Sequence, residues 1–124
     1  MAAGLTILAA WAPAAAPGGG LTADPGGLRL ELTSVPVRPT TGAATVYRAR
    51  VVRADGRPAT GLKLTLGGRM ADGMTVLAPL RPAGEPGVYE GRVLYTMEGQ
   101  WELTVRIADK GQSSELPLSE QVGR

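Results

Sequence analysis

The stretch that decides the fold is Trp101-Glu102-Leu103-Thr104-Val105-Arg106-Ile107, in which apolar and polar side chains alternate without a break. A period of two is typical of a β-strand with one buried face, because successive side chains point to opposite sides of a strand. Trp101 lies on the apolar side of this alternation. We therefore expect its indole to fill the centre of a core between two sheets.

Shorter alternating runs precede and follow this stretch. They predict strands over residues 28–33, 45–53, 62–66, 88–96 and 115–118, with residues 75–80 as a further short strand. We expect the third run to end at Gly67-Gly68, and the last to be an edge strand because Pro117 lacks a backbone donor. Asp55-Gly56-Arg57-Pro58 and Asp109-Lys110-Gly111 are turn signals between runs.

This pattern predicts an all-β fold, an Ig-like antiparallel β-sandwich of six to seven strands over residues 21–124. The 18 Gly and 10 Pro of the 124 residues suit one domain with many turns. Glu85-Pro86-Gly87-Val88-Tyr89 fits a tyrosine corner, in which the phenol bonds to backbone a few residues upstream. We interpret Tyr89 and Trp101 as structural residues, with a binding role for Tyr89 as the alternative.

Residues 1–20 differ in composition from the rest of the chain. Residues 2–16 are uncharged and rich in Ala and Leu, and Gly18-Gly19-Gly20 follows as a hinge. About 15 residues span roughly 22 Å as a helix, less than the ~30 Å of a bilayer core but suited to the apolar centre of a secretory signal. No Lys or Arg follows Met1. We expect an export signal or a short membrane or partner anchor; a leader without a role is the alternative.

The composition excludes several classes of function. The chain has no His and no Cys, which excludes zinc fingers, His-ligated haem and Cys or Ser/His/Asp nucleophiles. The carboxylates are not arranged as a recognisable acid–base pair, so we expect no enzyme activity and no small-molecule substrate. A net charge of +2 is too small to indicate nucleic-acid binding.

Met70, Met74 and Met97 are the candidate metal ligands. Thioether sulfur favours Cu(I) over harder cations. Met70 and Met74 share a face if the segment between them is extended, and Met97 approaches from a neighbouring turn. Packing in or around the core and an apolar contact surface for a partner are the alternatives to a Cu(I) cofactor. Asp72 is interpreted as half of an Asp-Gly turn with Gly73.

Arginines recur on one face of the predicted strands. Arg48, Arg50 and Arg92, with Arg53, are candidate partner contacts, forming a basic strip toward lipid phosphates or an acidic subunit. The alternative is a solvated face of mixed charge, because three glutamates are equally available as cross-strand partners. These are Glu31, Glu90 and Glu102.

Several motifs between residues 41 and 107 follow one another in the order of a known family. They are Thr41-Gly42, Asp55-Gly56-Arg57-Pro58, Gly87-Val88-Tyr89 and Met97-Glu98-Gly99-Gln100-Trp101-Glu102-Leu103-Thr104-Val105. Together they resemble the YtkA-like and FixH-like family of small exported or membrane-anchored bacterial domains. The resemblance implies an Ig-like sandwich outside the cytoplasm, without established catalytic activity, associated with haem-copper oxidases or copper-handling proteins. The lack of His and Cys departs from copper sites that use those residues.

These observations lead to one main functional expectation and two alternatives. We expect a non-catalytic, extracytoplasmic accessory or assembly subunit, on the periplasmic side, that associates with a membrane complex or membrane surface. A respiratory or other electron-transfer complex is the expected kind of partner. The alternatives are a periplasmic Cu(I) carrier that uses the three methionines, and a structural spacer or adhesion module.

Overall fold

The computed structural model describes residues 21–23 and 27–124, and its secondary structure there consists of antiparallel strands. The expected leader and hinge, residues 1–20, lie outside the described residues. In chain order the strands are β1 (Leu21–Ala23), β2 (Arg29–Val35), β3 (Thr45–Val52), β4 (Lys63–Arg69), β5 (Thr75–Pro82), β6 (Val88–Val93), β7 (Gly99–Asp109) and β8 (Gln112–Val122). The all-β prediction is confirmed.

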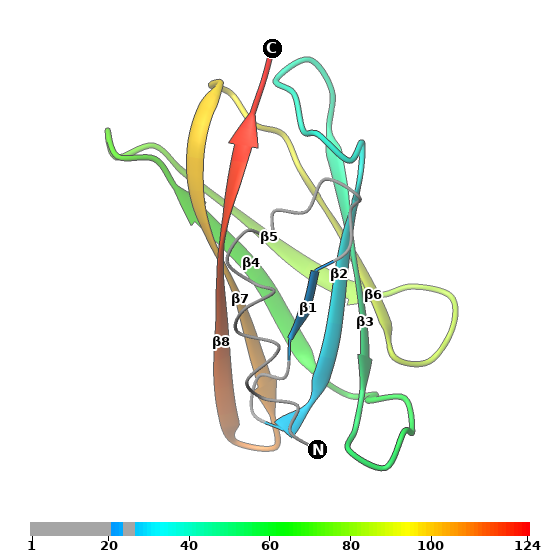
Figure 1. Ribbon diagram of the computed structural model, residues 1–124. Coiled ribbons are helices and arrows are strands. Elements are labelled where there is room, and N and C mark those ends of the chain that lie inside the picture. Colours follow the sequence, from blue (N-terminus) through cyan, green and yellow to red (C-terminus); the bar gives the residue numbers. More distant parts are fainter. Residues whose placement is uncertain (1–20, 24–26) are drawn as a thin grey trace.

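The strands form two facing layers that are joined at one corner (Figure 1). Their order is β1-β2-β3-β6-β5-β4-β7-β8, but β5 and β6 pair at only two positions, Arg81 with Glu90 and Pro82 with Tyr89. One layer is therefore β1-β2-β3-β6 and the other is β5-β4-β7-β8. The seven longer strands, β2 to β8, make the predicted sandwich, and the three-residue β1 adds a strand that was not predicted.

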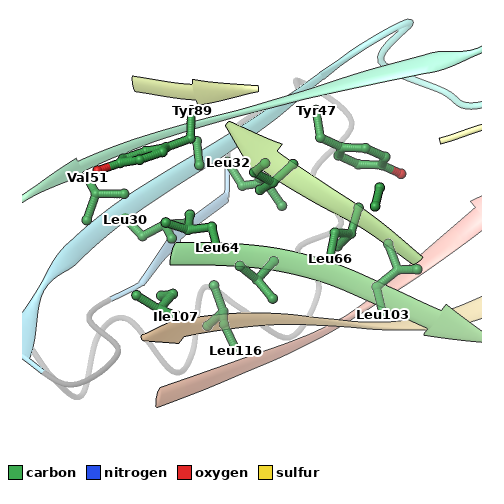
Figure 2. Packing of buried hydrophobic residues seen from close by; sticks show 14 of the residues in the cluster. Leu30, Leu32, Tyr47, Val51, Leu64, Leu66, Tyr89, Leu103, Ile107 and Leu116 are labelled. Carbon is green, nitrogen blue, oxygen red and sulfur yellow. The ribbon is translucent and has the colours of Figure 1, made fainter. Parts of the chain in front are cut away.

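The core lies between the layers and follows the predicted alternation. Every second residue of β7 from Trp101 to Ile107 is buried, and so are Leu30 and Leu32 of β2. Figure 2 shows side chains of the two layers meeting, with Tyr47 and Tyr89 toward opposite ends of the packed region. The period of two therefore specifies which face of each strand is removed from water.

The predicted end of the third run at Gly67-Gly68 is wrong, because β4 continues through both glycines to Arg69. Gly68 faces Leu103 of β7, and a Cβ added at Gly68 would collide with the Leu103 side chain. Glycine is used here because its neighbour fills the space that a side chain would need. The short strand expected at residues 75–80 is also longer, since β5 runs from Thr75 to Pro82.

The C-terminal strand is an edge strand within the described residues, as predicted, but it is much longer than residues 115–118. β8 pairs with β7 over its whole length of 11 residues. Lys110 and Gly111 connect the two strands, and both have positive φ angles, 51° and 85°. Two such residues form the tight hairpin turn that matches the twist of paired strands.

Alternating strand directions place the connections at two ends of the sandwich. The apical end, as we name it, carries the β2–β3, β4–β5 and β6–β7 connections and the C-terminus. The basal end carries the β3–β4, β5–β6 and β7–β8 connections. Thr40 and Gly123 form a parallel bridge at the apical end, so the last residues are fixed to the β2–β3 connection.

Candidate functional site

Trp101 lies where it was expected, fully buried between the layers. Its indole Nε1 donates a hydrogen bond to the carbonyl oxygen of Met97 at 3.0 Å, so the buried N–H has a partner. The ring packs against Tyr95 with the centroids 5.2 Å apart and the planes tilted by 58°. This tilted arrangement is one that aromatic pairs favour.

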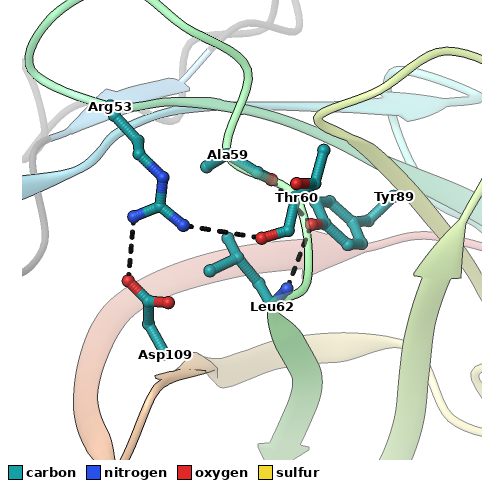
Figure 3. Close-up of polar contacts among 6 residues, drawn as sticks. All are labelled: Arg53, Ala59, Thr60, Leu62, Tyr89 and Asp109. Carbon is teal, nitrogen blue, oxygen red and sulfur yellow. Dashed lines mark hydrogen bonds and ion pairs between the residues drawn. The ribbon is translucent and has the colours of Figure 1, made fainter.

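Tyr89 is also buried, but it does not form the expected tyrosine corner (Figure 3). Its hydroxyl donates to the carbonyl oxygen of Ala59 at 2.7 Å and accepts from the backbone N–H of Leu62 at 3.3 Å. Both partners lie about 30 residues upstream, in the β3–β4 connection, rather than a few residues upstream. The local motif indicated that the Tyr89 hydroxyl bonds to backbone. The packing of β6 against the β3–β4 connection determines which backbone groups it contacts.

A second buried polar cluster links the two layers, and the sequence interpretation missed it. The hydroxyls of Tyr47 on β3 and Tyr95 lie 2.6 Å apart, and Tyr47 also donates to Glu120 Oε1 on β8 at 3.2 Å. Glu120 is half-buried and is the register partner of Trp101. The alternation Leu116, Leu118, Glu120 and Val122 places this carboxylate on the inner face of β8, and extending the predicted strand past Leu118 would have revealed it.

Burial controls the protonation of this cluster. Desolvation raises the pKa of Glu120, and the hydrogen bond from Tyr47 opposes that increase only in part. Desolvation likewise raises the pKa of the Tyr47 and Tyr95 hydroxyls, so both remain protonated. Glu120 is therefore the member of the cluster whose charge changes as the pH rises from acidic values.

The Glu120→Gln variant is expected to be more stable than the wild-type protein at neutral pH. The folded chain holds the Glu120 proton more tightly than the unfolded chain, so ionisation as the pH rises lowers the stability of the wild type. Gln keeps an oxygen for the Tyr47 hydroxyl and carries no charge. The gain should be about 1 kcal/mol or less at pH 7, the usual size of a single-residue effect, and should disappear below the ordinary pKa of a glutamate, as measured by urea unfolding across pH.

Glu115→Gln provides the matched control for that prediction. Glu115 lies on the same strand but on the exposed face, paired with Arg106 at 2.9 Å. Loss of this charge should change the unfolding free energy by no more than about 0.5 kcal/mol. An equal gain in both variants would mean that net charge, rather than burial of Glu120, explains the effect.

Arg53 and Asp109 fasten the basal end of the sandwich (Figure 3). Arg53 Nη1 lies 3.0 Å from Asp109 Oδ2 and Nη2 lies 3.5 Å from the carbonyl oxygen of Thr60. The Arg53 guanidinium lowers the pKa of Asp109. The ion pair of Asp109 therefore stabilises the fold above the ordinary pKa of an aspartate, and this stabilisation is lost as the pH falls. The pH dependence is opposite in sign to that of Glu120.

The three methionines all lie at the apical end, but the segment between Met70 and Met74 is a hairpin turn and not extended. The chain reverses at Asp72-Gly73, where the Asp72 carboxylate accepts from Met74 N–H at 3.0 Å, as the turn interpretation expected. Met70 N–H donates to the Met74 carbonyl at 2.9 Å, so the two residues face each other across a hairpin. A Cβ added at Gly99 would lie 2.7 Å from Met70 Cε, which places Met70 beside the segment that follows Met97.

These methionines differ in exposure. Met70 packs against the core, as the gap-filling alternative expected, whereas Met74 and Met97 are exposed at 36% and 41%. Residues opposite each other across a hairpin point their side chains to the same face. Two exposed thioethers and one half-buried thioether thus share one end of the molecule.

The basic strip is largely neutralised by glutamates. Arg48 pairs with Glu90 at 3.1 Å, as the mixed-charge alternative expected, and Arg50 pairs with Glu85 of the β5–β6 connection at 3.2 Å. Arg92 is exposed near the apical end and has no ion-pair partner among residues 27–124. Of the three candidate contacts, Arg92 is therefore the one whose charge is available.

Two expected members of this face lie elsewhere. Arg53 is at the basal end with Asp109, so it does not belong to the strip. Glu102 lies on β7, in the other layer, where it accepts from Gln100 and Ser119. The sequence alone does not determine which strands become neighbours, and the choice of neighbouring strands decides which charged side chains can form ion pairs.

The described part of the chain offers little else that could bind a hard metal ion. No group of three Asp or Glu side chains within it lies close enough to hold one. In the same residues, no helix is long and apolar enough to cross a membrane.

The model of one protein family matches residues 22–106, from the second residue of β1 to Arg106 in β7. The chain belongs to the YtkA-like family. No curated protein matches the sequence at a significant level. The matched range begins before the motifs that carried the resemblance and leaves β8 outside, so the Glu120 cluster of this YtkA-like domain involves a strand beyond the family match.

Proposed function

We propose that this YtkA-like domain is a non-catalytic, extracytoplasmic accessory or assembly subunit of a membrane complex, on the periplasmic side. A respiratory or other electron-transfer complex is the partner we favour. Membership of the YtkA-like family is the observation that carries this proposal. The function of such a subunit depends on recognition by its surface.

The arrangement of polar groups supports this proposal. The buried hydroxyls of Tyr47, Tyr89 and Tyr95 are engaged in hydrogen bonds that hold strands and connections together. Arg53 and Asp109 likewise join the start of the β3–β4 connection to the end of β7. Groups with these partners stabilise the sandwich. Most of the large hydrophobic side chains that are exposed in the described residues lie at the apical end.

The test is retention in native membranes. Membranes that contain the full chain are washed with high salt and then with carbonate, and the protein is followed in both fractions. We expect retention with the membrane, together with other proteins of one complex that are captured with it from native membranes. Release of all the protein as a lone monomer would contradict the proposal, and retention without any specific partner would favour the spacer or adhesion module.

The second candidate is a periplasmic Cu(I) carrier, and the shared apical position of Met70, Met74 and Met97 favours it. Titration of Cu(I) against a competing chelator should then give one site. The Met70→Leu/Met74→Leu variant should abolish that site, because leucine keeps the apolar volume and removes the sulfur. Binding weaker than micromolar in the wild-type protein would exclude this candidate.

A further inference from the structure

Exposed apolar residues are concentrated at the apical end. Within residues 27–124, six large hydrophobic side chains are exposed, and five of them lie at or beside the apical connections. Val35 and Val37 belong to the end of β2 and the β2–β3 connection, and Leu94 and Met97 belong to the β6–β7 connection. Met74 is in the β4–β5 turn, and the sixth residue is Leu77 on β5.

Available positive charge accompanies these apolar residues. Val35, Val46 and Arg92 lie opposite one another across β2, β3 and β6, and Leu94 follows two residues after Arg92. Arg38 is exposed beside Val37. Neither Arg38 nor Arg92 has an ion-pair partner in the described part of the chain, whereas Arg48 and Arg50 further down the same face are paired.

The shape of the apical end favours a partner with a deformable, anionic surface. Figure 1 shows the β2–β3 connection and the β4–β5 turn on opposite sides of the apical end, so the apolar residues stand on separate tips. Aliphatic tips beside arginines suit the boundary between lipid headgroups and acyl chains, where apolar burial and attraction to anionic headgroups act together. Arginine also binds phosphate oxygens through its planar fork of donors.

We propose that the apical end docks onto an anionic phospholipid surface. Val35, Val37, Leu94 and Met97 enter the headgroup layer, and Arg38 and Arg92 contact lipid phosphates. This surface deepens the proposed membrane association by naming the face involved, and it rests on that proposal only for its biological setting. The long axis of the sandwich then stands away from the bilayer, with the basal end directed outward.

The test uses a fluorophore placed at one position of the full chain. The chain has no Cys, so Leu94→Cys gives a single site for an environment-sensitive label, and Ala54→Cys gives a matched site at the basal end. Vesicles of phosphatidylcholine, or of equal parts phosphatidylcholine and phosphatidylglycerol, are then added. We expect a shift to an apolar environment at position 94 with the anionic vesicles only, and none at position 54.

Charge reversal provides the second arm. Arg38→Glu/Arg92→Glu should weaken the response at position 94 at least tenfold in lipid concentration, because each arginine near an anionic surface contributes roughly fivefold to binding. Lys63→Glu/Lys110→Glu makes the same change of charge at the basal end and should leave the response unchanged.

Three results would overturn the proposal. In the first, the label at position 94 stays in water when anionic vesicles are added, and in the second, the labels at positions 94 and 54 respond equally. In the third, the response at position 94 grows with protein concentration in the absence of vesicles, which would indicate binding to a second copy of the chain. The vesicles contain no other protein, so failure here leaves the accessory-subunit proposal standing. Conversely, release of a lone monomer from native membranes would contradict the accessory-subunit proposal but would not test whether the apical end binds anionic phospholipid.

Discussion

Trp101→Ala is expected to lower the free energy of unfolding by about 3–5 kcal/mol. The substitution leaves a cavity between the layers, removes the ring that Tyr95 packs against and leaves the Met97 carbonyl without its indole donor. Because domains of this size have about 5–15 kcal/mol of stability, much of the total is lost. Urea unfolding followed by far-UV circular dichroism measures the change.

Leu77→Ala is the control for loss of a large apolar side chain. Leu77 is 77% exposed on the outer face of β5, so its truncation removes little buried area. Its unfolding free energy should stay within about 0.5 kcal/mol of the wild-type value. A Trp101→Ala variant that loses less than about 1 kcal/mol would show that the indole is not the centre of the core.

Gly91→Ala is expected to cost about 1–3 kcal/mol or more, although it adds a single methyl group. A Cβ at this position would lie 2.5 Å from the Pro79 carbonyl oxygen and 2.5 Å from Leu80 Cδ2. The oxygen belongs to the backbone, so relief requires β5 to move away from β6 at the corner that joins the two layers. The same unfolding measurement, with hydrogen exchange of β5 and β6 amides, tests both the loss and its location.

Gly42→Ala is the matched glycine control. A Cβ there meets no atom within 4 Å, and Gly42 is not among the glycines with positive φ. The Gly42→Ala variant should be as stable as the wild-type protein or slightly more stable, because alanine restricts the conformations of the unfolded chain. Equal stability of the Gly91→Ala variant and the wild-type protein would mean that the corner is looser than the structure indicates.

The strands that alternate strongly could be predicted from the sequence, and the reason is physical. In β7 and β2 the burial of one face fixes both the strand and its register, so the pattern of residues carries the information. At Gly67-Gly68 the local preference of glycine for breaking strands is overridden by close packing against Leu103. The length of β8 was missed because Pro117 and the charged Glu120 interrupt the apolar pattern.

The candidate site was less predictable than the fold, because its contacts join distant parts of the chain. Tyr89 could be recognised as a residue needing a polar partner, but Ala59 and Leu62 become its partners only when the β3–β4 connection packs against β6. Arg50 pairs with Glu85, 35 residues away, rather than with a cross-strand neighbour. The shared position of the methionines was expected, but it arises from a hairpin rather than from an extended segment.

We propose above all that this YtkA-like domain acts by recognition within a membrane complex. The most direct measurement is the apparent mass of the full chain in native membranes solubilised in mild detergent, followed by native electrophoresis. We predict migration in a band much larger than its own 12.8 kDa, together with the same partner proteins in repeated preparations. Migration of all the protein at the mass of one chain, with no co-migrating partner, would contradict this proposal.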